Sequence, residues 1–168
     1  MLKPALFLAA ALLPSLALAQ EAPGGGAPIA PTFDVQAART RIDAGLDRNY
    51  PQLQALYEDI HQHPELGFQE QRTAALLAAR MRKLGFTVTE HVGKTGIVAI
   101  YKNGPGKTIL VRTELDALPL EEKTGLPYAS HAQQTRDGRL TYVAHAWGHD
   151  IHMAWWVGTA EALLAMKD

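Results

Sequence analysis

Apolar residues recur at helical spacing through the first half of the chain. The pattern runs from Phe33 to Ile60, and Pro51 is expected to be a first-turn residue of a second helix within it. A further helix is predicted from about Gln69 to Leu84, where Gly85 is placed to end it. Three helices in succession are therefore expected.

The period then shortens to a loose alternation, which is typical of strands. Strands are predicted at 86–92, 96–101 and 108–112. The sequence Asn103-Gly104-Pro105-Gly106 is a hairpin signal, so the second and third of these strands are expected to pair antiparallel. A last helix is predicted from near Asp150. Helices, strands and a helix in this order indicate an α/β layer arrangement.

The first 32 residues differ from the rest. Residues 1–19 combine Lys3, an apolar run and a small-residue cleavage signature, which predicts a secretory signal peptide and an exported, periplasmic or secreted protein. No stable membrane anchor is expected, because the run is interrupted by Pro14 and is shorter than the roughly 20 residues that cross a bilayer. Residues 20–32 are rich in Gly, Ala and Pro and predict a flexible linker, which leaves 33–168 as the folded part.

Charge and cysteine content exclude several classes of function. The chain has 16 basic and 17 acidic residues and no basic run, so nucleic acid is not an expected partner. It has no cysteine, which excludes disulfides, thiolate metal sites and cysteine nucleophiles.

The densest chemical signal is a group of three of the seven histidines, His145, His149 and His152, together with Asp150. Imidazole suits zinc, manganese, cobalt or nickel. His149 and His152 are three positions apart and would share a helix face, while Gly148 permits a tight backbone before them. Spacing alone fits a metal site and a hydrogen-bonded structural cluster equally well.

Two other segments carry candidate chemistry. Glu114 and Asp116 follow an apolar strand and would share a face, where they could orient a metal-bound histidine or water; a solvated strand end is the slightly preferred alternative. Residues 61–70 hold two histidines and two glutamates. Their preferred interpretation is a connector between helices, with Glu70 interacting with the dipole of the next helix.

Three stretches in series, HPELGFQE, ELDALPLEEKTGLPYAS and HAWGHDIHM, resemble signature blocks of a known enzyme family. The blocks read HPELGxxE, DMDALPxxExTGLPYxS and HACGHDxHx. They are typical of the amidohydrolase branch of the aminoacylase and metallo-carboxypeptidase superfamily, which includes hippurate hydrolases, N-acyl-amino-acid amidohydrolases and auxin-conjugate hydrolases.

The resemblance implies a zinc-aminopeptidase-like catalytic domain, with a mixed sheet flanked by helices, and a separate lid domain. It implies one or two divalent metal ions and a glutamate general base that act on N-acyl or N-aroyl amino acids or peptide-like substrates. The full-length parent could form a homo-oligomer. The base, later histidine ligands and the lid are expected to follow the end of this chain, which would carry the first half of the catalytic domain and would not hydrolyse amides by itself.

Matching the blocks position by position assigns roles. His149 corresponds to the histidine ligand and Asp116 to the aspartate that supports the metal centre. His145, His152 and Asp150 correspond to other positions near the metal.

Two positions depart from the family pattern. Trp147 replaces the family's cysteine ligand and has no lone pair for a metal, and Glu114 replaces an aspartate. Two alternatives therefore remain: a non-catalytic binding protein in which Trp147 fills the metal pocket, and a dipeptidase of the same superfamily.

Overall fold

Three helices and two small sheets form the part of the chain that the computed structural model describes, residues 33–167. All of these elements belong to the unit formed by residues 34–168. The signal peptide and the linker expected at 1–19 and 20–32 lie outside the described residues. Within residues 33–167, none of the helices combines the length and apolarity needed to span a bilayer.

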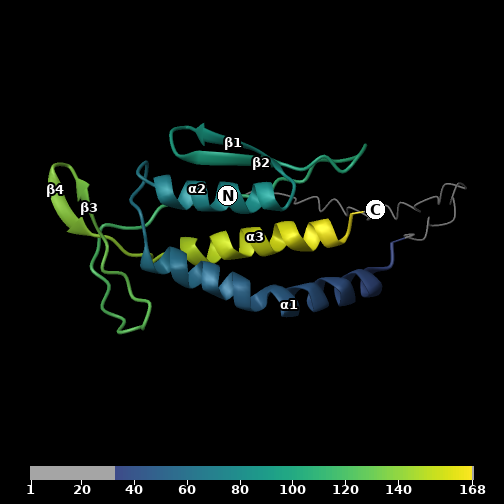
Figure 1. The fold of residues 1–168 in the computed structure, drawn as a ribbon, viewed down its shortest axis with the longest axis horizontal. Helices are drawn as coiled ribbons and strands as arrows, with labels where there is room; N and C mark the ends of the chain where they lie inside the picture. Colours follow the sequence, from purple (N-terminus) through teal and green to yellow (C-terminus); the bar gives the residue numbers. More distant parts are fainter. Residues whose placement is uncertain (1–32, 168) are drawn as a thin grey trace, which may run out of the picture. The chain divides into compact units, whose positions relative to one another are not determined.

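The first helix, α1, spans Val35–Gln62 without interruption (Figure 1). The Asp34 carboxylate caps it by accepting a hydrogen bond from the Ala37 amide at 2.9 Å. The expectation of two helices was wrong, because Pro51 lies inside α1. Ala38 before this proline and Leu56 after it are buried, and Leu53 and Leu56 pack in the core. We attribute the continuity of the helix to that burial.

Replacing Pro51 with alanine should raise the free energy of unfolding by about 2 kcal/mol. An interior proline lacks an amide donor and clashes with the preceding turn, at a cost of about 3 kcal/mol, part of which returns because proline also restricts the unfolded chain. Urea unfolding followed by circular dichroism would measure the change. Gln52→Ala, at the neighbouring exposed position, is the control, and an equal gain in both variants would contradict the explanation.

The second helix, α2, spans Gln71–Lys83, close to the predicted range. The Glu65 carboxylate accepts hydrogen bonds from the amides of Arg72 at 3.0 Å and Thr73 at 2.7 Å. The sequence had predicted that Glu70 would interact with this end of the helix. Instead the buried Glu70 carboxylate accepts a hydrogen bond from the Thr95 hydroxyl at 2.6 Å, so Glu65 stabilises the first turn.

The strands β1 (Thr87–Val92) and β2 (Gly96–Ile100) pair antiparallel, with Thr87 opposite Ile100. Both strands were predicted, but the pairing was not. The segment 108–112 forms no strand, and Leu110 is 89% exposed. The tight turn at Gly93 and Lys94, both with positive φ, brings β1 onto β2, whereas the longer loop at 103–106 does not return the chain to β2.

A second hairpin, β3 (Gln133–Arg136) with β4 (Arg139–Tyr142), was not predicted. Asp137 and Gly138 turn it, with φ of 51° and 74°. An Asp-Gly pair with two positive φ angles is a favoured hairpin turn. The surrounding residues are mostly polar, so they gave no apolar alternation that would indicate strands.

The third helix, α3, spans His149–Ala165 and begins next to the predicted position. It lies between α1 and α2, and the β1–β2 hairpin packs against α2 (Figure 1). The core where the helices meet consists of Leu56, Ile60, Leu77, Met153 and Val157. The α/β class is confirmed, although the sheet predicted as one mixed sheet is two separate antiparallel pairs.

Candidate functional site

Two isolated bridges bring the three motif segments together. The amide of Ala117 donates to the carbonyl of Glu65 at 2.8 Å, within a parallel bridge between Leu66 and Ala117. Leu118 and Ala144 exchange two hydrogen bonds of 3.0 Å in an antiparallel bridge. Segments more than 20 positions apart in sequence therefore meet beside the start of α3.

The backbone turns sharply into α3 at Gly148, which has a φ of 79°. This left-handed conformation favours glycine and agrees with the role expected of Gly148. No side chain caps the helix here. The turn places His149 as the first residue of α3, directly after the left-handed glycine.

The imidazole of His149 is held by Asp116. Nδ1 of His149 lies 2.8 Å from the backbone carbonyl oxygen of Asp116 and 3.3 Å from its carboxylate Oδ1. Because a carbonyl oxygen only accepts hydrogen bonds, Nδ1 carries a proton, and in the neutral ring Nε2 then keeps its lone pair. Metal-binding histidines are commonly oriented by this kind of hydrogen bond from the other ring nitrogen.

His152 lies one turn further along α3 and is exposed. Its ring centroid is 6.2 Å from that of His149 and 5.5 Å from that of Trp155. The ring centroid of Trp147 lies 6.1 Å from that of His149, and Trp147 is 68% exposed. The indole of Trp147 therefore lies on the surface and fills no pocket within the described part of the chain.

His145 is buried, with 8% of its surface exposed, and its Nε2 has no hydrogen-bond partner among the described residues. Burial lowers the pKa of His145 to about 4, against a partial opposing effect of the Asp150 carboxylate. The ring is consequently neutral at pH 7 and keeps a lone pair available.

Glu114 makes no hydrogen bond or ion pair with the candidate histidines in the described part of the chain. Its carboxylate pairs with Arg112 at 3.0 Å. Among residues 33–167, no three side chains of His, Cys, Asp or Glu are placed to hold a metal ion together. The ring of His149 is oriented by Asp116, and the metal-binding roles of His149, His145 and His152 stay predictions.

Sequence reasoning missed a buried network around His61, at the end of α1. Nδ1 of His61 lies 2.6 Å from the Asp150 carboxylate and Nε2 lies 3.1 Å from the Glu122 carboxylate. The rings of Tyr57 and Tyr128 pack against His61 and against each other. Glu122 occupies the glutamate position of the second motif block, which was the signal that could have found it.

This environment shifts three pKa values. Burial alone would lower the pKa of His61, but its hydrogen bonds to Asp150 and Glu122 outweigh burial and raise it. Burial opposes ionisation of Glu122, yet hydrogen bonds from Thr124, Ser130 and His61 lower its pKa. Burial and the neighbouring Tyr128 raise the pKa of Tyr57 to about 12. An imidazolium between two carboxylates accounts for the directions at His61 and Glu122.

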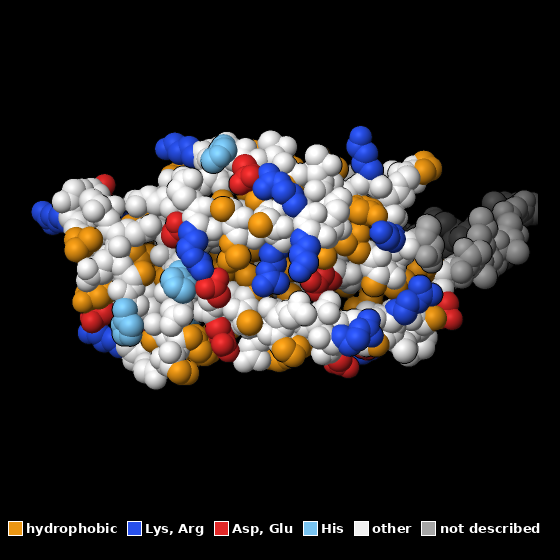
Figure 2. All heavy atoms as spheres, viewed as in Figure 1, with side chains coloured by type: hydrophobic (Ala, Val, Ile, Leu, Met, Phe, Trp, Pro, Cys, Tyr) orange, Lys and Arg blue, Asp and Glu red, His pale blue; other side chains and the backbone are white. Residues whose placement is uncertain are grey.

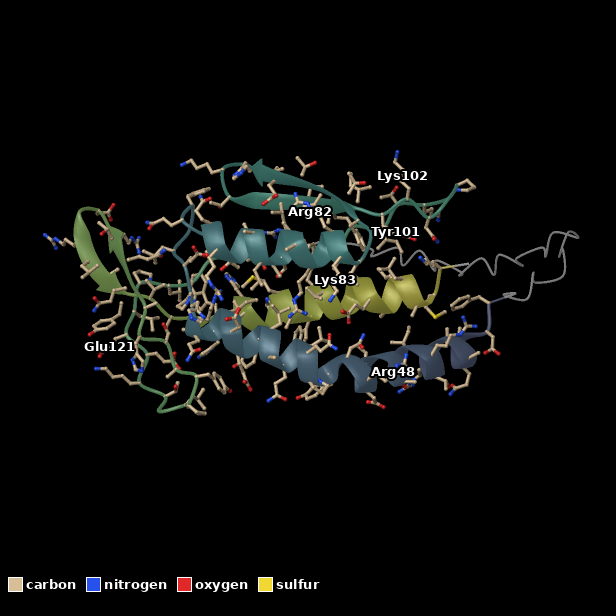
Figure 3. All side chains as sticks on the ribbon, viewed as in Figure 1. Arg48, Arg82, Lys83, Tyr101, Lys102 and Glu121 are labelled. Carbon is tan, nitrogen blue, oxygen red and sulfur yellow. The ribbon has the colours of Figure 1, made fainter. Side chains whose placement is uncertain are left out.

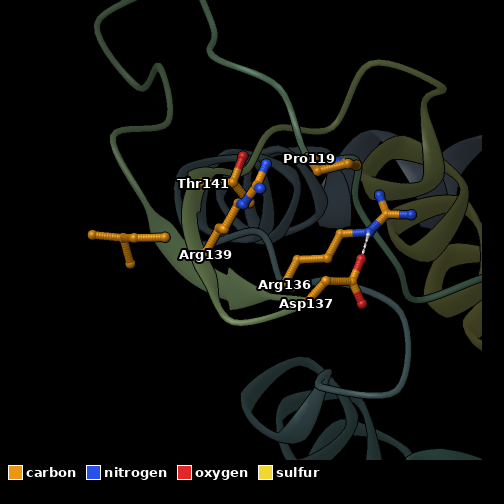
Figure 4. A pocket seen from close by; sticks show the side chains of 6 residues that line it. Pro119, Arg136, Asp137, Arg139 and Thr141 are labelled. Carbon is orange, nitrogen blue, oxygen red and sulfur yellow. Dashed lines mark ion pairs between the residues drawn. The ribbon is translucent and has the colours of Figure 1, made fainter.

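Two hollows lie away from this network. One of about 460 Å³ is formed by Pro119 and the β3–β4 hairpin, where Arg136 and Asp137 pair at 3.7 Å (Figure 4). The other, of about 320 Å³, is lined mainly by apolar residues of α2, β2, α3 and the segment 109–115. Neither is lined by a candidate histidine.

The charged surface is mixed in sign. Figure 2 shows Lys and Arg interspersed with Asp and Glu on the face drawn. Arg82 pairs with Glu90 at 2.5 Å, and Arg82 and Lys83 lie in the last turn of α2 (Figure 3), where positive charge favours the helix dipole.

Comparison with known proteins gives consistent similarities. No protein-family model matches the chain. The chain is 41% identical over 117 residues to hippurate hydrolase of Campylobacter jejuni, which covers 69% of this chain and 27% of that protein. It is 42% identical over 111 residues to thermostable carboxypeptidase 1 of Saccharolobus solfataricus, which covers 65% and 26%.

A solved structure shares the fold. The Bacillus subtilis YXEP protein, described as a dinuclear metal binding peptidase from the M20 family, superposes with a TM-score of 0.60 at 33% identity, covering 74% of this chain and 32% of that one. The chain thus spans between 26% and 32% of the length of these three proteins.

Proposed function

Because the chain belongs, by sequence and by fold, to the superfamily of aminoacylases and metallo-carboxypeptidases that includes the M20 peptidases, we propose that it contributes to metal-dependent hydrolysis of amide bonds. The substrates we propose are N-acyl or N-aroyl amino acids, small molecules in which an amide joins a carboxylic acid to an amino acid. The observation that carries the proposal is the His149 imidazole, fixed by Asp116 with Nε2 free.

In this proposal His149 is a metal ligand, and His152 and His145 are further candidate donors to one or two ions of zinc, manganese, cobalt or nickel. When bound, such an ion supplies a Lewis acid that polarises the amide carbonyl. Asp116 keeps the proton on Nδ1 of His149 and fixes the plane of its ring, which directs the Nε2 lone pair.

Trp147 changes the donor set. An indole offers only an N–H donor, so the position that holds cysteine in the family motif supplies no ligand here. Further donors must come from other residues, and the described part of the chain has no group of three suitable side chains. This supports one rival proposal, a non-catalytic binding protein. Export through residues 1–19, to the periplasm or outside the cell, also remains a proposal.

The chain alone should show no amide hydrolysis. Since residues 33–167 bring one oriented histidine and no complete donor set, incubation with Mn²⁺ or Zn²⁺ and N-benzoylglycine should release glycine no faster than metal ions alone. Turnover above that background would refute the prediction. Calorimetric titration with Zn²⁺ separates the two functional classes: micromolar binding supports the metal site, and absence of heat supports the non-catalytic protein.

A further inference from the structure

The two ends of residues 143–150, here called the histidine segment, are tied to a single buried side chain, His61. This segment runs from Val143 through His145 to Asp150 and includes His149. At its far end, the Asp150 carboxylate lies 2.6 Å from Nδ1 of His61. The imidazole thus joins the end of α1 to the first turn of α3.

The near end of the histidine segment is reached through Glu122. Nε2 of His61 lies 3.1 Å from Oε1 of Glu122, and Oε2 of Glu122 accepts the amide of Ser130 at 2.6 Å. The Ser130 hydroxyl donates to the carbonyl of Val143 at 2.7 Å. His61, Glu122, Ser130 and Val143 therefore form a continuous buried path to the residue two positions before His145.

Both contacts of His61 require it to donate. An ionised carboxylate only accepts hydrogen bonds, so an imidazole that serves Asp150 and Glu122 together must carry a proton on each nitrogen. Charge-assisted hydrogen bonds of this kind are shorter and stronger than neutral ones. Tyr57 and Tyr128 pack against the ring, and a neutral imidazole, which has a single N–H, could donate to only one of the two carboxylates.

Met153 anchors α3 in the core, but the turn before it lacks a capping side chain. Gly148 has a left-handed φ and no side chain caps the helix. His149 is held on one side by Asp116, and its neighbour Asp150 is held by His61. Loss of the second anchor would let the first turn of α3 rotate about Gly148, which would change the direction of the His149 ring.

We propose that His61 is a positioning residue: by bridging Asp150 and Glu122 it fixes both ends of the histidine segment and thereby the orientation of His149. This inference rests on the proposed function in one respect only, the presence of a metal ion at His149. The geometry of His149 can be measured without any metal, so the two can fail separately.

The test compares His61→Gln with His63→Gln in the full chain. His63 lies two positions further on, exposed, with its ring bonded to the Asp59 carbonyl at 2.7 Å, so its loss removes a histidine from the same helix end without touching the network. Two-dimensional ¹H–¹⁵N spectra of the histidine side chains report the tautomer of His149, and Zn²⁺ titration reports affinity. Circular dichroism confirms folding.

We expect wild type and His63→Gln to show His149 protonated on Nδ1. His61→Gln should lose that single tautomer and bind Zn²⁺ about 10-fold more weakly, the lower end of the effect of removing a direct partner of a metal ligand, because His61 acts on His149 through Asp150. A folded His61→Gln with the wild-type His149 spectrum and unchanged affinity overturns the inference and leaves the proposed function standing. A third outcome is possible: His61→Gln loses the tautomer, and the wild type binds no Zn²⁺. That outcome supports the inference about His61 and contradicts the proposed metal site.

A second variant covers the case in which His61→Gln does not fold. Glu122→Gln keeps the shape of the side chain and removes its charge, so it weakens one of the two anchors only. It should broaden or shift the His149 signals in the same direction and by less. A folded Glu122→Gln with unchanged His149 signals would count against the proposal.

Discussion

His149→Gln is expected to weaken Zn²⁺ binding by more than about 10-fold. Removal of a residue that only supports a metal ligand already weakens binding by about 10-fold or more, and His149 is the proposed ligand itself. The His149 ring is the candidate donor whose proton is fixed on Nδ1 by Asp116, which leaves Nε2 to bind a metal. Glutamine can still reach the Asp116 carbonyl with its amide but has no imidazole lone pair. Isothermal titration calorimetry would measure the affinity.

The control for this prediction is His131→Gln. His131 is exposed, between the TGLPY sequence and β3, and its loss tests whether any histidine on the surface accounts for the heat. Equal affinities in wild type and His149→Gln would show that the metal binds elsewhere.

Leu77→Ala is expected to lower the free energy of unfolding by about 3 kcal/mol. Leu77 is fully buried in α2 and packs in the core with Leu56, Ile60, Met153 and Val157. Truncation of a buried leucine loses transfer free energy and leaves a cavity, which together cost about 2–5 kcal/mol. A single domain has only about 5–15 kcal/mol in total, so the variant should lose a large share of its stability. Urea titration followed by circular dichroism measures the loss.

Leu140→Ala is the matched control, because Leu140 lies on β4 and is 68% exposed. Its loss should change stability by less than about 0.5 kcal/mol. Similar losses at the two positions would mean that the α1–α2–α3 core contributes less than its burial indicates.

The helices could be predicted from sequence because their burial has a simple period. Thr73, Ala74, Leu77, Ala78 and Met81 recur at the spacing of one helix face, and all are buried in α2. Pro51 misled the prediction because its intrinsic cost is local, whereas the packing that offsets it comes from α3, 100 positions later in the sequence. Residue types alone do not show whether the packing of α1 outweighs the cost of the proline.

Strand pairing was harder to predict than the helices, since it depends on which turn brings two strands side by side. The strands at 86–92 and 96–101 had recognisable patterns, but two turns competed for the second of them. His91, Gly93 and Lys94 adopt positive φ, and this was not evident from residue types, of which only Gly93 favours it. The Gly-Pro sequence at 103–106 was the stronger signal and indicated the wrong partner.

The contacts among the candidate residues could be predicted only in part. His149, Asp116 and Asp150 were identified from the motif blocks, and the structure brings His149 against Asp116. The buried partner of Asp150, His61, comes from a segment 89 positions earlier. No pattern in a single sequence indicates which carboxylate meets which imidazole across such a separation, so that network required the fold.

The position of the aromatic residues has a practical consequence. All three tryptophans of the chain, Trp147, Trp155 and Trp156, fall within ten consecutive positions at the start of α3. Trp147 contacts His149 and Trp155 contacts His152. Two of the three intrinsic fluorophores of this type therefore lie beside candidate histidines, and quenching of their emission by a paramagnetic ion such as Co²⁺ would report occupancy there.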